Sequence, residues 1–319
     1  KGIYDIHTFH AATGNRFPDN LILSHDLIEG VHARCGFICD VELIESEPSR
    51  VLADASRRHR WIRGDWQIAD WLLPRVPGPD GRPQRNPLGM LARWMIFDNL
   101  RRSLVPAALF LALVSGGWAW PAHATGRIAG LLGMYMLPAG LRTLRAFLFK
   151  GKQVPPAIHL RAAAVNEGRQ WILDLLELAF TPYLAWVYLD AMVRVFWRRR
   201  VHRRLLEWKT ASQSERTART SLPGTLREMW PAPILAAACA APALAGIAPG
   251  NPLLLGLAGA WLAAPVLAWW VSSARPARDL PLTAAQTEFV RQLARRTWAF
   301  FDHFTCEASH WLPPDNFQE

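Results

Sequence analysis

The sequence lacks the features by which several classes of protein are recognised. Its 319 residues include only four cysteines, and these are scattered. Cys35 and Cys39 fit one face of a helix, but no second pair of ligands follows, so reduced structural thiols are a better interpretation than a zinc site. No glycine-rich loop suited to hold a phosphate occurs. We find no internal repeat and no low-complexity tract.

The chain also opens without an initiator methionine and without the charged, then apolar leader of a secreted protein. It begins with Lys1 and ends abruptly after Glu319. We therefore expect it to be a piece of a longer protein.

What the sequence does contain is tryptophan, arginine and long apolar runs. It is 51% hydrophobic, with 16 tryptophans and a formal net charge of +10. Tryptophan is typical of membrane interfaces, where its ring and its N–H donor both find partners. Clustered positive charge indicates nucleic acid or the anionic inner leaflet of a membrane. Because the arginine clusters flank apolar runs, and because no nucleic-acid-binding motif is present, the membrane is favoured.

The apolar runs predict four membrane spans, near 104–120, 128–149, 232–248 and 253–273. An amphipathic helix over 90–102, with basic ends, is predicted to lie in the membrane interface. Every basic loop then falls on the cytoplasmic side, and so do both ends of the chain.

The segment 171–197 is apolar enough to cross, but it carries Asp174, Glu177 and Asp190 and is interrupted at Thr181-Pro182. Both of its flanks are basic, and each buried carboxylate costs about 2.5 kcal/mol or more near the bilayer centre. We therefore expect a broken pair of interfacial or re-entrant helices. A crossing in which the acids face other helices remains the alternative.

The fold class predicted is a mainly α membrane protein in three parts. Residues 1–89 contain a predicted helix from 24 to 35, a strand at 37–46, a helix at 50–73 and a linker, which suggests the closing part of an α/β domain. Residues 90–273 form the membrane part. Residues 274–319 contain a soluble helix over 283–305, capped by Thr283, and a linker to a further domain.

Two short motifs contain the residues suited to catalysis and substrate binding. They are SHDLIEG at 24–30 and RRHRWIRGDWQ at 57–67. The first holds a carboxylate in a polar turn, and the second concentrates cations and two indoles. Transfer of a sugar to a hydroxyl needs these groups: a base for the acceptor proton, cations near the departing diphosphate, and a flat aromatic face for the sugar ring.

The motif at 24–30 and the part HRWIRGDWQ at 59–67, with LLEW at 205–208 and WLPPDNFQE at 311–319, resemble those of the bacterial cyclic β-1,2-glucan synthases. The resemblance covers nearly the whole chain. It implies the end of a GT-A-like transferase domain, an interfacial helix and about four spans. It also implies an inverting inner-membrane enzyme that polymerises glucose from UDP-glucose, and a downstream phosphorylase-like domain on the same polypeptide.

Carried over by position, the resemblance implies that Asp26 is the catalytic base, although a helix N-cap is its alternative role. It implies that Trp61 stacks on the acceptor glucose and that Arg60 faces the diphosphate. A basic helix lying on the membrane is the alternative for this pair. Arg57 stands where such synthases have glutamine, which puts the hydrogen bonds of that glutamine in doubt.

The remaining candidates for substrate binding are His59, Asp65 and Trp66. Their alternatives are structural: a hydrogen-bonding histidine, an aspartate paired with Arg63 or capping a turn, and a core indole. The Asp-x-Asp words that bind the nucleotide and a metal-bound diphosphate are absent from this sequence. We therefore expect the ligands of Mg²⁺ or Mn²⁺ to lie outside the chain, and the chain to be inactive alone. A non-catalytic membrane scaffold or transport module is the alternative function.

Overall fold

The computed structural model describes residues 5–18, 20–23, 26–36, 48–118, 121–150, 154–201, 203–207, 213, 219–247, 249–273, 282–307 and 310–312. The chain divides into two compact units, Lys1–Ser273 and Ala274–Glu319.

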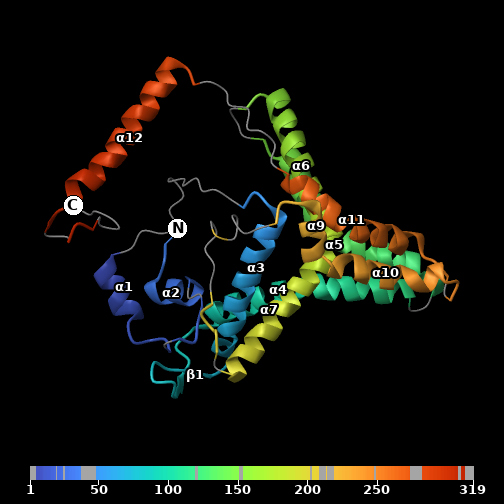
Figure 1. The fold of residues 1–319 in the computed structure, drawn as a ribbon, viewed down its shortest axis with the longest axis horizontal. Helices are drawn as coiled ribbons and strands as arrows, with labels where there is room; N and C mark the ends of the chain where they lie inside the picture. Colours follow the sequence, from blue (N-terminus) through green and yellow to red (C-terminus); the bar gives the residue numbers. More distant parts are fainter. Residues whose placement is uncertain are drawn as a thin grey trace. The chain divides into compact units, whose positions relative to one another are not determined.

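The described residues of the first unit form helices almost entirely (Figure 1). Its elements are α1 (Ile6–Thr13), α2 (Asp26–Ala33), α3 (Val51–Gln67), η1 (Ala69–Leu72), β1 (Arg75–Pro77), β2 (Pro83–Arg85), α4 (Met90–Trp118), η2 (Pro121–His123), α5 (Ala124–Leu148), α6 (Pro156–Ala179), α7 (Thr181–Val201), α9 (Leu222–Glu228), α10 (Pro231–Leu244) and α11 (Pro252–Ser272). The short strands form an antiparallel hairpin in which Val76 lies opposite Gln84. This confirms the mainly α prediction. The strand predicted at 37–46 lies outside the described residues.

The predicted interfacial helix and the first predicted span are one continuous helix, α4. The prediction of two separate helices was wrong because no helix-ending signal separates them. Pro106 lies inside α4 without interrupting it, since a helix in an apolar environment tolerates a proline when neighbouring groups satisfy the freed carbonyl.

Among the described residues, two helices, α4 and α11, are long and apolar enough to cross a membrane, and the pair α6–α7 passes the same criteria as one bent unit. The sequence predicted four spans, and two of them, within α4 and α11, have this length and apolar character in the described structure. The 25-residue α5 carries Arg127, Arg142 and Arg145, which reduce its hydropathy. The 14 residues of α10 reach only about 21 Å, short of a hydrocarbon core of about 30 Å.

The interruption predicted at Thr181-Pro182 is confirmed: α6 ends at Ala179, α7 begins at Thr181, and the two helices are bent by 66°. The acids of α6 are paired with arginines of other helices. Asp174 lies 2.7 Å from Arg142 of α5, and Glu177 lies 2.6 Å from Arg58 of α3. Pairing with other helices is what the alternative prediction requires, in which the segment 171–197 crosses the membrane with its acids facing other helices.

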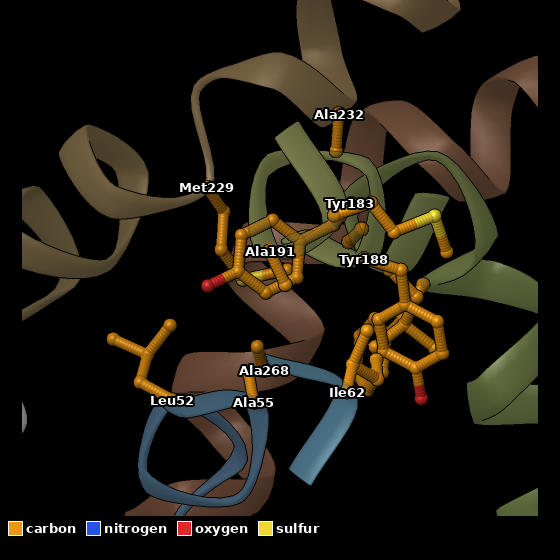
Figure 2. Close-up of a cluster of buried hydrophobic side chains, with 13 residues drawn as sticks. Leu52, Ala55, Ile62, Tyr183, Tyr188, Ala191, Met229, Ala232 and Ala268 are labelled. Carbon is orange, nitrogen blue, oxygen red and sulfur yellow. The ribbon is translucent and has the colours of Figure 1, made fainter. Parts of the chain in front are cut away.

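A buried apolar cluster fastens α3 to α7 and α11 (Figure 2). On one side it contains Leu52 and Ile62 of α3, and on the other Tyr183 and Tyr188 of α7. Small residues allow the backbones to approach closely; they are Ala191, Ala232, Ala264 and Ala268. The first turn of α3 is also tied to the end of α11, because the Val51 amide donates to the hydroxyl of Ser272 over 3.0 Å.

The second unit contains α12 (Ala284–Phe304). Thr283 caps it as predicted, in a reciprocal arrangement with Gln286 that satisfies two N–H groups at the helix start. The helix predicted over 283–305 is therefore confirmed.

Candidate functional site

Helix α3 separates two clefts. With 3.6 residues per turn, positions 58, 61 and 65 lie on one face of a helix and positions 56, 59, 60 and 63 on another. The first set lines a cleft of about 450 Å³ that also contains Asp26, called here the Asp26 cleft. The second set lines a cleft of about 600 Å³ against α7 and α9, called here the basic cleft.

The Asp26 cleft brings together three of the predicted site residues, Asp26, Trp61 and Asp65. Asp26 is the first helical residue of α2, and its side chain is exposed. Helix α2 is anchored by Ile28, which is fully buried in a cluster with Trp71 and with apolar residues of α4. This anchor places the carboxylate beside α3, although 35 residues separate Asp26 from Trp61 in the sequence.

Trp61 presents an accessible aromatic surface, with 47% of the residue exposed. The guanidinium of Arg57 lies over its ring, 4.7 Å from the centroid, as in a cation–π contact. The same guanidinium is 2.7 Å from Asp54, so it is held in place. Arg57 lines neither cleft. Its contacts therefore orient the indole, one turn further along α3.

Asp65 is the second acid of the cleft. Burial raises its pKa to about 6, and a hydrogen bond from the amide of Asn99 on α4, 3.1 Å away, opposes that rise only in part. The alternative pairing with Arg63 is wrong, because Arg63 lies on the other face of α3. A half-buried carboxyl beside an indole is equipped to accept hydrogen bonds from sugar hydroxyls.

Sequence reasoning missed Arg58, which also lines the Asp26 cleft. Its guanidinium donates to Asp54 over 2.7 Å, to Glu177 over 2.6 Å and to the hydroxyl of Tyr188 over 3.4 Å. It thereby connects α3 with α6 and α7. The four-residue spacing from Asp54 was an available signal, but the contacts with α6 and α7 span more than 100 residues.

Trp66 lies in the core rather than in either cleft, in line with its structural alternative. Its Nε1 donates to Ser103 of α4 over 2.9 Å, and its ring meets Phe196 of α7 edge to face. The next residue, Gln67, is 2% exposed; it accepts from the Leu23 amide and donates to the carbonyl of Leu205.

The basic cleft contains His59 and Arg60. His59 Nε2 lies 2.9 Å from a carboxylate oxygen of Asp190, while burial lowers the pKa of the imidazole. Trp61 was predicted to stack on the acceptor glucose and Arg60 to face the diphosphate. The two residues line different clefts, because neighbouring positions on a helix point about 100° apart.

No group of three histidine, cysteine, aspartate or glutamate side chains that could hold a metal ion occurs among the residues described. These residues therefore do not fit Mg²⁺ or Mn²⁺. The expectation that the metal ligands lie outside this chain stays a prediction.

The comparisons with known proteins bear on the whole chain. No family model matches it. Among curated proteins, it is 37% identical over 326 aligned residues to the cyclic beta-(1,2)-glucan synthase NdvB of Rhizobium meliloti (strain 1021). The alignment covers 100% of this chain but 11% of that protein, so the chain spans about a tenth of the length of its relative. The resemblance seen in four short motifs thus extends from end to end, and the chain is related throughout to a segment of a cyclic beta-(1,2)-glucan synthase.

Proposed function

We propose that this chain forms the acceptor side and the membrane part of an inverting glucosyltransferase. The enzyme polymerises glucose from UDP-glucose into β-1,2-glucan at the inner membrane of a bacterium. The observation that carries the proposal is the Asp26 cleft, in which an exposed carboxylate, an accessible indole and a second carboxyl lie together. The similarity to a glucan synthase along the whole chain supports the same assignment.

In the proposed reaction, Asp26 takes the proton of the acceptor 2-hydroxyl while that oxygen attacks the anomeric carbon of the donor. The new C–O bond forms as the bond from the anomeric carbon to the diphosphate breaks. UDP leaves with the bonding electrons, and the configuration at the anomeric carbon is inverted. A base positioned in this way accelerates a reaction by about 10²- to 10⁴-fold.

The other residues of the Asp26 cleft hold the acceptor. Trp61 offers its ring to the C–H face of the terminal glucose, and Arg57 keeps that ring in orientation. Asp65 accepts hydrogen bonds from the hydroxyls of the acceptor sugar, and the amide of Asn99 donates hydrogen bonds to them. The apolar helices α4 and α11 anchor the cleft at the bilayer, with both ends of the chain on the cytoplasmic side. A GT-A-like transferase half precedes the cleft in the polypeptide, and a phosphorylase-like domain follows.

The test is Asp26→Asn in the full-length protein. Incorporation of glucose from UDP-glucose into glucan should fall by at least about 100-fold, with the protein still in the membrane fraction. Glu29→Gln is the matched control, since it removes an acid one turn later on α2 that does not line the cleft. A near-normal rate in Asp26→Asn would show that Asp26 is not the base.

One observation favours the alternative of a transport module. Arg142 of α5 bonds both Glu167 and Asp174 of α6, and Thr143 links the same Glu167 to Trp171. Such a polar network between two helices can line a path through a membrane. Thermal stabilisation of the full-length protein by UDP-glucose separates the two functions, because a transport module with no nucleotide-sugar site gains no stability from it.

A further inference from the structure

We propose that the basic cleft between α3, α7 and α9 binds the phosphate headgroup of an anionic phospholipid. This site is separate from the Asp26 cleft. The proposal depends on the apolar helices entering a bilayer and not on sugar transfer, so it goes beyond the function proposed above.

The first observation is a surplus of positive charge in the basic cleft. Five arginines and three carboxylates line it. All three carboxylates are engaged: Asp190 with Arg194, Glu207 with Arg198, and Glu228 with an arginine outside the cleft. In the part of the chain that the structure describes, the other three arginines have no carboxylate within 4 Å; they are Arg60, Arg63 and Arg227.

The second observation is the burial of Arg63, which is only 8% exposed. Its Nη2 donates to the backbone carbonyl of Glu207 over 2.8 Å. Its Nε has no hydrogen-bond partner within the described residues. A buried guanidinium with no carboxylate within 4 Å is costly. An anion in the cleft supplies the missing charge.

The third observation is the position of the basic cleft at one end of the α10–α11 hairpin. Helix α11 is long and apolar enough to span a membrane, and its last residue, Ser272, contacts the first turn of α3. Trp230 immediately precedes α10, which packs antiparallel against α11. The cleft therefore lies where α11 would leave the hydrocarbon, at the depth of the headgroups.

The walls of the basic cleft suit a lipid better than a free anion. Trp186 and Trp230 line it, their rings meet edge to face 5.2 Å apart, and each residue is 45% exposed. Paired indoles at this depth are typical of a membrane interface. Val187, which is half-buried, adds apolar surface beside the arginines. A headgroup phosphate fits the arginines, and its glycerol and acyl chains fit this apolar wall.

The experiment measures lipid binding to the delipidated full-length protein in neutral detergent. Phosphatidylglycerol is titrated and the bound lipid counted by native mass spectrometry, with phosphatidylcholine as the zwitterionic comparison. We expect the unmodified protein to bind phosphatidylglycerol in preference to phosphatidylcholine. Arg227→Gln should weaken phosphatidylglycerol binding about fivefold, the effect of one basic residue at a membrane surface.

The matched control is Arg200→Gln. Arg200 is an exposed arginine on α7 that does not line the cleft, so this variant removes the same charge from the same region. Equal weakening by Arg200→Gln and Arg227→Gln overturns the proposal, because it shows diffuse attraction to charge. No weakening by Arg227→Gln also overturns it.

Two further arms identify the source of the phosphate. Inorganic phosphate and UDP are added to the protein as competitors of phosphatidylglycerol. If either displaces the lipid at concentrations comparable to the lipid Kd, the cleft is a soluble-phosphate site and the lipid assignment is wrong. Failure of both to compete supports it. Since none of these measurements uses glucan synthesis, the result is independent of the base assignment of Asp26.

Discussion

Replacing Asp65 with asparagine should stabilise the protein and at the same time impair its activity. Asp65 is half-buried, and its pKa is raised from 3.8 to about 6. Each pKa unit corresponds to about 1.4 kcal/mol, so keeping this carboxylate ionised in the fold costs about 3 kcal/mol. Asparagine removes that cost and retains the hydrogen bond, because its side-chain oxygen also accepts from Asn99.

The sign of the pH dependence follows from the direction of the pKa shift. Between pH 3.8 and about 6 the folded protein holds more protons at Asp65 than the unfolded chain does. The free energy of unfolding therefore falls as the pH rises through this window, and the cost is fully present above pH 6. Asp65→Asn should thus raise Tm by several degrees at pH 7.5 and have little effect at pH 4.

The assay is thermal unfolding of the full-length protein in detergent at several pH values, together with glucan synthesis at pH 7.5. Asp80→Asn is the control, since Asp80 lies in the exposed turn between β1 and β2. It should leave both stability and synthesis unchanged. A stabilised Asp65→Asn with reduced synthesis indicates that the carboxylate is kept for binding. Loss of stability in Asp65→Asn at pH 7.5 would refute the reasoning.

Two further pairs of variants test the assignments. Trp61→Ala should raise the KM for the glucan acceptor without lowering Tm. Trp66→Phe should leave that KM unchanged but cost about 1 kcal/mol of stability, because it loses the hydrogen bond to α4. The reverse pattern would show that the two tryptophans have each other's role. Gly117→Ala should lower Tm, because its Cβ would lie 2.3 Å from a methyl of the buried Leu254, at a cost of about 1–3 kcal/mol. Gly116→Ala, whose Cβ would meet no atom closer than 3.5 Å, should leave Tm equal or higher, and a fall of similar size in both variants would refute the packing argument.

Local pattern was sufficient for the features that depend on neighbouring residues. Spacing and capping chemistry predict three such features. They are the α12 cap at Thr283, the interruption before Thr181, and the helix that carries the basic and aromatic motif at 57–67. Local pattern was not sufficient for the lengths of the membrane spans. Whether arginines such as Arg142 interrupt a span depends on their partners, and those partners lie on another helix.

The sequence by itself determined that the chain is mainly helical, that it carries apolar helices long enough for a membrane, and which short motifs resemble a glucan synthase. Tertiary structure alone decided which side chains of those motifs lie together in one cleft. Packing of α2 through Ile28 places Asp26 in one cleft with Trp61, and the turn of α3 sends Arg60 into another. The physical reason is that a helix fixes the direction of each side chain locally, while the wall that it faces comes from residues far along the chain.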